Sequence, residues 1–429
     1  MWADETVFYQ IYPLGFTGAP FVNDGIPVSR ILKLKDWIPH IQKLGVGAVL
    51  LNPVFASVSH GYDTTDLRQP DCRLGSNEDM AAVCRAFHEA GIRVVLDGVF
   101  NHVGRGFGPF QDLLARRWES PYKDWFHVSF DGNNSYNDGL WYESWEGHEE
   151  LVKLNLQNED TVRYLLESVA LWIREFDIDG LRLDVAYCLD RNFIGRLKEM
   201  GEHMKPEFFL VGEMIHGDYS GLLNSGLDSV TNYAVYKGLY SGFNSMNMFE
   251  IMHSLKRQEE LYRGRHLLNF VDNHDVTRIA SILNDPGHLP LVYTILFAMP
   301  GIPCIFYGSE WGTRGDKSQG DPALRPAFEA PAWEPLTDHI AALSKIFSAS
   351  PALKYGAFRT LFLTNRQCVF ERRVDGQRIL AAVNADAAPF YAGFDSGAGQ
   401  MKNLLTGKTV ETGGGLQMEA YTSYLLCDL

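Results

Sequence analysis

Eight short apolar runs alternate with longer amphipathic stretches along this chain, and no other feature constrains its fold as much. The runs are rich in β-branched and aromatic residues, and most show no regular alternation of apolar and polar side chains. Such runs are typical of strands buried on both faces of a parallel sheet. They occupy residues 8–13, 48–54, 93–100, 178–186, 207–214, 227–233, 266–272 and 302–308.

The stretches between these runs have helical patterns. In the first of them Ile31, Trp37, Ile38 and Ile41 recur at helical spacing. The expected helices span 28–43, 77–90, 159–176, 189–204, 246–261, 276–298 and 335–348. Eight strands with intervening helices predict an α/β fold of the (β/α)₈ barrel type.

Two segments do not fit this alternation. Residues 103–152 are rich in Gly, Trp and Tyr and are expected to form an insertion after the third strand. Residues from 354 onward alternate as strands separated by Gly-rich turns, which predicts a small all-β domain. We therefore expect a barrel over 1–102 and 153–350, an inserted domain over 103–152 and a C-terminal β domain over 351–429.

Charge and composition exclude several classes of function. The net charge of −15 over 429 residues argues against a nucleic-acid partner, which calls for a basic surface. The N-terminus resembles no signal peptide, and no apolar run approaches the roughly 18 residues of a membrane span. The expected protein is cytoplasmic, with no membrane partner.

Polar side chains gather where the predicted strands end, at the rim that carries the active site of a barrel. An Asp after a strand is often only a helix cap, but four carboxylates, two His and one Arg at one rim favour a site. A converging acidic cluster lets one carboxylic acid stay protonated while another stays ionised, and two such groups flanking an acetal linkage make a glycosidase. The residues are Asp97, His102, Arg182, Asp184, Glu213, His274 and Asp275.

Four short segments carry a family resemblance. They are DGVFNH (97–102), GLRLDVA (180–186), GEMIHG (212–217) and FVDNHD (270–275), and FYQIYP, GYDTTD and DPALR support them. In this order they resemble the signature regions of the α-amylase family, family 13 of the retaining glycoside hydrolases. The resemblance implies a catalytic barrel, an inserted domain B after strand 3 and a C-terminal β-sandwich.

The resemblance also implies a role for each matching residue. Asp184 matches the nucleophile, Glu213 the general acid/base and Asp275 the carboxylate that grips the distorted sugar. We expect like charges to raise the pKa of Glu213, and Arg182 to keep Asp184 ionised. Substrate-binding roles are implied for Tyr62, His102, Arg182, His274, Asp321 and Arg325.

The chemistry implied by the family needs no cofactor. Asn101 matches a position that ligates structural calcium in many members, while the other ligands of such an ion cannot be matched. The metal site is therefore unassigned from the sequence.

LVKLN (151–155) and GDPALRP resemble the neopullulanase and cyclomaltodextrinase branch of the family. The chain departs from that branch in lacking its extra N-terminal domain and in carrying Tyr187-Cys188 and Met214-Ile215 beside the leaving-group side of the cleft. The expected function is retaining hydrolysis of α-1,4-glucosidic bonds in maltooligosaccharides, cyclodextrins or starch fragments, by a monomer or homodimer.

Two alternatives stay open at this stage. One is an α-glucan transglycosylase with the same triad and a sugar acceptor in place of water. The other is a carbohydrate-binding relative without activity, which the intact set of Asp184, Glu213 and Asp275 disfavours.

Overall fold

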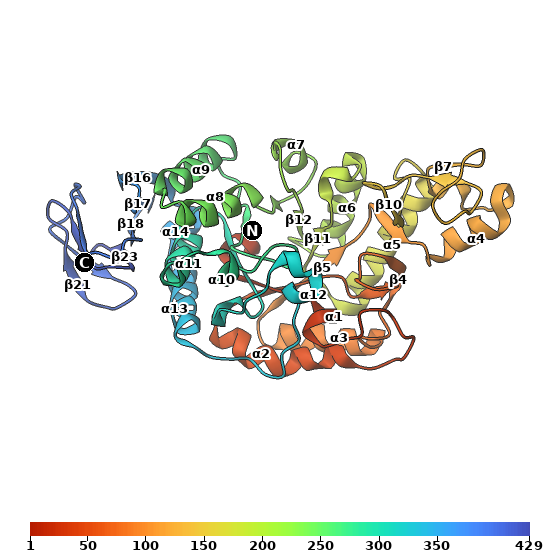
Figure 1. Cartoon of the computed structure of the whole chain (residues 1–429), viewed down its shortest axis with the longest axis horizontal. Helices are drawn as coiled ribbons and strands as arrows, with labels where there is room; N and C mark the ends of the chain where they lie inside the picture. Colours follow the sequence, from red (N-terminus) through yellow and green to blue (C-terminus); the bar gives the residue numbers. More distant parts are fainter.

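All eight predicted strands form one parallel sheet in the computed structural model, which describes residues 1–429 (Figure 1). Their order is β13-β12-β11-β5-β2-β1-β15-β14, and a bridge between Thr231 and Leu268 joins the two ends. The strands thus follow one another in chain order around a closed barrel, which confirms the predicted fold. Their bounds are β1 Phe8–Ile11, β2 Ala48–Leu51, β5 Arg93–Gly98, β11 Gly180–Leu183, β12 Phe209–Gly212, β13 Ser229–Val230, β14 Leu268–Asn269 and β15 Ile302–Phe306.

The barrel strands are apolar throughout because both of their faces are buried. A cluster of twelve buried residues, including Phe8, Leu50, Val95 and Ile302, fills the barrel interior. The opposite strand faces join a larger core of 93 buried residues that the surrounding helices complete. The sheet is therefore a packed scaffold, and its functional groups project from the strand ends.

Long helices surround the sheet (Figure 1). They are α2 Leu34–Lys43, α3 Asn77–Glu89, α5 Glu159–Phe176, α6 Arg191–Met204, α8 Tyr233–Asn244, α9 Met248–Leu261, α11 Leu289–Ala298 and α13 Pro335–Ala349. Short helices lie between them: α1 Pro13–Phe16, α7 Ser220–Leu223, α10 Ile279–Ile282, α12 Asp321–Leu324 and α14 Pro351–Tyr355. The single helix predicted over 276–298 is wrong. It is split into α10 and α11 around Asp285, Pro286 and Gly287, since proline and glycine disfavour a helix interior.

The segment after β5 forms a small lobe at one end of the molecule (Figure 1). Its elements are β6 His102–Gly104, α4 Gly108–Arg116, β7 Val128–Ser129, β8 Trp141–Tyr142, β9 Ser144–Trp145 and β10 His148–Lys153. β10 pairs with both β6 and β9, so the chain returns to the point where it left the barrel. Glu146 and Gly147 form the turn between β9 and β10 with positive φ values of 48° and 87°, as tight hairpins require.

The C-terminal strands form a two-layered β domain at the other end (Figure 1). β16-β17-β18-β23-β20-β21 make one antiparallel sheet, and β19 and β22 make a second layer. Val369, Leu380, Met401 and Met418 belong to the apolar core of this sandwich. The bounds are β16 Ala357–Leu363, β17 Gln367–Val374, β18 Gln377–Asn384, β19 Phe390–Ala392, β20 Gln400–Asn403, β21 Thr409–Glu411, β22 Leu416–Met418 and β23 Thr422–Cys427.

The sandwich is the predicted one. The domain limits at 102/103, 152/153 and 350/351 stay a proposal. A further antiparallel pair, β3 Phe55–Ser57 and β4 Thr64–Pro70, lies in the loop after β2.

Candidate active site

The catalytic candidates lie at the carboxyl ends of neighbouring strands. Asp184 directly follows β11, Glu213 directly follows β12, and Asp97 is the next-to-last residue of β5. β11 pairs in parallel with both β5 and β12, and the register aligns Arg182 with Asp97. The three carboxylates therefore project from adjacent positions on one rim of the barrel.

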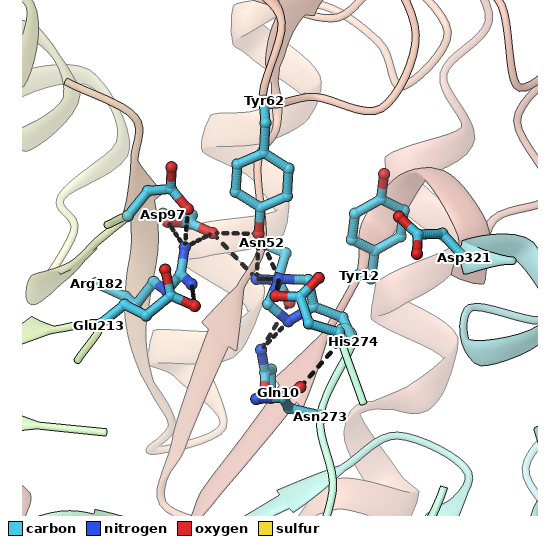
Figure 2. A network of polar contacts seen from close by, with 12 residues as sticks. Gln10, Tyr12, Asn52, Tyr62, Asp97, Arg182, Glu213, Asn273, His274 and Asp321 are labelled. Carbon is cyan, nitrogen blue, oxygen red and sulfur yellow. Dashed lines mark hydrogen bonds and ion pairs between the residues drawn. The ribbon is translucent and has the colours of Figure 1, made fainter. Parts of the chain in front are cut away.

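Arg182 links these three carboxylates through one buried guanidinium group (Figure 2). Its Nη1 lies 2.9 Å from both carboxylate oxygens of Asp97 and 2.8 Å from Asp184 Oδ1. Its Nη2 lies 2.7 Å from Glu213 Oε1. One positive charge thus serves three acidic groups, so the cluster keeps an excess of negative charge.

Burial and this excess of negative charge together determine how strongly the cluster binds a proton. Burial raises the pKa of Asp184 well above its usual range, and this outweighs the opposing effect of Arg182. Glu213 and Asp97 raise the pKa of Asp184 further, because they are like charges at short range. Arg182 lowers the pKa of Asp184 as expected, but burial and the like charges outweigh this effect, so the cluster retains a proton more strongly than an isolated Asp does.

Glu213 is tied to the strand that carries Asp184. The backbone N–H of Val185 donates to Glu213 Oε2 at 3.0 Å. Val185 has a φ of +39°, in the left-handed region that a β-branched residue rarely adopts. This unfavourable backbone conformation directs its N–H toward Glu213 and is typical of the strain found at functional sites.

His274 and Asp275 form the opposite part of the group. Gln10 on β1 donates to His274 Nδ1 at 3.0 Å, so Nε2 carries the ring proton, and this atom lies 2.5 Å from the Tyr62 hydroxyl and 2.9 Å from Asp275 Oδ2. Although burial raises the pKa of Asp275, the nearby Nε2–H of His274 and the positive charges of Arg325 and Arg182 hold that pKa well below its usual range. Asp275 is thus kept as a carboxylate.

Arg325 joins Asp275 to Asp321. Its Nη2 lies 3.0 Å from Asp275 Oδ1 and 3.0 Å from Asp321 Oδ2. The Arg325 carbonyl packs against Gly15, where a Cβ atom would lie only 2.3 Å away. Glycine at position 15 is therefore needed to keep Arg325 in place.

Tyr62 stands over the centre of the group. Its hydroxyl donates to Asp97 Oδ2 at 3.0 Å, and its ring stacks on His274 with centroids 5.8 Å apart. Asn52 donates to the same Asp97 oxygen at 3.0 Å. Hydrogen bonds therefore join Asn52, Tyr62 and Asp97 at the centre of the group (Figure 2).

These side chains surround a cavity of about 560 Å³. Seven of the nine predicted site residues line it: Tyr62, His102, Asp184, Glu213, Asp275, Asp321 and Arg325. Arg182 and His274 do not line it and hold the lining carboxylates from behind. The structure therefore brings all nine residues into one site.

The match to known proteins agrees with this geometry. The family model described as Alpha amylase, catalytic domain, matches residues 10–341. The chain belongs to the alpha-amylase family.

Three relatives show how far the similarity extends. A cyclomaltodextrinase of Geobacillus thermopakistaniensis is 30% identical over 95% of this chain and 74% of its own length. An intracellular maltogenic amylase of Bacillus subtilis is 30% identical over 78% of this chain and 59% of its own length. The solved structure of a cyclic alpha-maltosyl-(1→6)-maltose hydrolase of Arthrobacter globiformis superposes with a TM-score of 0.87, at 25% identity and full coverage of both chains.

Within this alpha-amylase family chain, several lining residues come from positions that sequence reasoning missed. Trp145 and His148 reach the cavity from the hairpin of β9 and β10, and their rings stack at 5.3 Å. Ile215 and Tyr233 line the side next to Glu213. No strand-end signal marks the hairpin residues, whereas Gln10 and Asn52 lie in the predicted runs and could have been found by the same rule.

Two polar atoms beside the hairpin have no partner. His102 Nε2 and Trp145 Nε1 are buried without a hydrogen bond, and their rings lie 5.8 Å apart. Asn101 donates to His102 Nδ1 at 3.1 Å, so the free Nε2 carries the proton. Both atoms are therefore donors directed at the lining of the cavity.

The calcium site implied for Asn101 finds no matching ligands. The amide nitrogen of Asn101 donates to His102 Nδ1, and the chain has no group of three or more His, Cys, Asp or Glu side chains that could hold a metal ion. No step of the proposed chemistry is routed through a metal ion.

Proposed function

We propose that this protein is a retaining α-glucan hydrolase that cleaves α-1,4-glucosidic bonds of maltooligosaccharides, cyclodextrins or starch fragments. The observation that carries the proposal is the pairing of Asp184 and Glu213 on one Arg182 guanidinium, at the wall of a 560 Å³ cavity. The names of the relatives, cyclomaltodextrinase, maltogenic amylase and cyclic alpha-maltosyl-(1→6)-maltose hydrolase, support α-glucan hydrolysis over glucan transfer.

In the proposed mechanism Asp184 attacks the anomeric carbon while Glu213 protonates the glycosidic oxygen. The leaving sugar departs, and Glu213 then takes a proton from the water that hydrolyses the glycosyl-enzyme. The first step needs one proton within the cluster, and the raised pKa of Asp184 supports the view that the free cluster retains this proton. The first step requires this proton to stand on Glu213 when the sugar reaches Asp184.

The remaining site residues bind and orient the sugar. Asp275, held ionised by His274 and Arg325, accepts hydrogen bonds from hydroxyl groups of the distorted sugar ring. His102 donates from its free Nε2, Tyr62 provides a ring face, and Asp321 closes the pocket with Arg325. Arg182 orients both reacting carboxylates.

The setting of the enzyme is also proposed. The acidic net charge of −15 disfavours nucleic acid, and none of the helices combines the length and apolar character needed to cross a bilayer. The intracellular maltogenic amylase among the relatives supports a cytoplasmic location. We propose a monomer or homodimer that needs no cofactor for its chemistry.

The test combines a substrate panel with the stereochemistry of the product. Maltotriose, β-cyclodextrin, pullulan, starch and sucrose are incubated with the protein, and the products are separated by chromatography. Proton NMR in the first minutes should show α-anomers, since retaining sites hold their carboxyl groups only about 5–5.5 Å apart. A β-anomeric first product would refute the mechanism, and longer sugars as the main products at high substrate concentration would indicate transfer.

A further inference from the structure

An exposed apolar loop lies close to one end of the active-site cavity. The segment between α1 and α2 carries Phe21, Val22 and Ile26, which are 59%, 61% and 58% exposed. Val58, 44% exposed, lies beside this loop, since its carbonyl accepts from the Asn23 N–H at 2.9 Å. Gathered apolar side chains on a protein surface mark a binding site more often than isolated ones do.

A buried ion pair holds this loop in place. Arg73 is fully buried and pairs with Asp71 at 2.7 Å. The same guanidinium donates to the carbonyls of Pro20 at 2.8 Å and Phe21 at 2.9 Å. On the other side Asn23 donates to the Ser57 carbonyl at 2.9 Å. The backbone is thus held on both sides of Phe21, so its side chain projects from a fixed point of the loop.

Phe21 borders a second cavity, of about 260 Å³, that adjoins the first. Asp321 and Arg325 line both cavities. Tyr12, Pro20, Pro322 and Pro326 add ring faces to the second one. A volume of this size is below that of typical whole-ligand sites, about 300–1,000 Å³, and therefore suits one end of a ligand whose centre lies in the larger cavity.

The position of this second cavity indicates which end of the glucan chain it binds. A general acid protonates the leaving group, so the leaving part of the substrate lies beside Glu213. Figure 2 shows Glu213 and Asp321 on opposite sides of the polar group. The cavity beyond Asp321 therefore lies on the side of the sugars that stay on the enzyme.

We propose that Phe21 is a sugar-binding platform for the non-reducing part of the α-glucan chain. Pyranose rings present C–H faces that pack on aromatic and proline rings, while Asp321 at the shared wall accepts their hydroxyl groups. The inference rests on the proposed function and adds a substrate preference to it, namely for glucans that extend past Arg325.

The test varies only the non-reducing side of the substrate. α-Glucosyl fluoride places one ring beside Asp184, whereas α-maltotriosyl fluoride has the same leaving group and extends toward Phe21. In Phe21→Ala, kcat/KM for maltotriosyl fluoride should fall by about tenfold, and that for glucosyl fluoride should stay unchanged. Phe21→Trp, which keeps a ring, should retain the activity of the parent on both.

Val22→Ala is the matched control, because Val22 is equally exposed on the same loop and does not line the cavity. It should leave both substrates unaffected. Equal losses on both fluorides in Phe21→Ala, no loss on either, or the same selective loss in Val22→Ala would overturn the platform. If the parent protein hydrolyses neither fluoride, the proposed function itself is wrong and the platform falls with it.

Discussion

The active site has two parts that are built differently. Its floor is made of Asp97, Arg182, Asp184, Glu213 and His274. These residues lie on the barrel strands or shortly after their carboxyl ends, and they are buried and hydrogen-bonded. Its walls are made of Trp145 and His148, from the inserted β9–β10 hairpin, and of Ile215, from the loop after β12, and they carry unpartnered or exposed groups. The comparison indicates that the barrel fixes the reaction, while the loops decide which glucan reaches it.

Removing the nucleophile should have the largest effect. Asp184→Asn should lower kcat by about 10⁴-fold or more with the fold retained, because no covalent intermediate can form. Steady-state kinetics with a maltooligosaccharide and a circular dichroism spectrum measure both properties. Near-normal turnover in a folded variant would show that Asp184 is not the nucleophile.

Changing the acid should have a large effect that depends on the leaving group. Glu213→Gln should slow natural glucans by about 10³-fold, whereas the initial burst of fluoride from α-glucosyl fluoride should persist, since fluoride leaves without a proton. Stopped-flow fluoride release measures the burst. If both substrates are equally slow in this step, another carboxylate of the floor is the general acid.

A change in the walls should have a smaller effect of a different kind. Trp145→Ala should raise KM for maltooligosaccharides by about tenfold and leave kcat within a few-fold, because the indole contacts substrate away from the reacting bond. Trp118→Ala is the control, since Trp118 is a 67% exposed tryptophan of the same lobe that does not line the cavity. If Trp145→Ala loses as much kcat as the floor variants do, the proposed difference in role between floor and walls is wrong.

The smallest effect concerns stability and its pH dependence. The pKa of Asp184 is raised in the folded enzyme, so its contribution to stability is present below the unfolded pKa of about 3.9 and is lost as pH rises through the folded pKa. Asp184→Asn should therefore raise Tm at pH 7 by about 1–2 °C, given about 1 °C per kcal/mol for a chain of this length, and the gain should vanish near pH 4.

Asp275 provides the opposite case within the same site. Its lowered pKa stabilises the fold above pH 4 and ceases to do so as pH falls through the folded value. Asp275→Asn should therefore lower Tm at pH 7. Calorimetry of the two variants at pH 7 and pH 4 checks both signs, and equal signs would contradict the charge balance described for the cluster.

The sequence predicted the floor better than the walls for a physical reason. A strand buried on both faces must be largely apolar, so Asp184 and Glu213 stand out as charged residues near the carboxyl ends of such runs. Trp145 reaches the cavity only because β10 pairs with β6, a contact between distant residues that no local pattern reveals. The pKa of Asp184 could not be predicted either, because it depends on how completely the folded chain excludes water from the carboxylate.

The bridge between Thr231 and Leu268 has a consequence for motion. β13 and β14, the two-residue strands that this bridge joins, form the least extensive contact around the barrel. Local opening begins where few hydrogen bonds must break, so amide protons at this seam should exchange with solvent before those of β5 or β11. Glu213 lies on one side of the seam and Asp275 on the other, while Asp184 and Glu213 are on paired strands. Local opening between β13 and β14 would thus separate Glu213 from Asp275 first. Warming would therefore abolish turnover before the whole fold is lost.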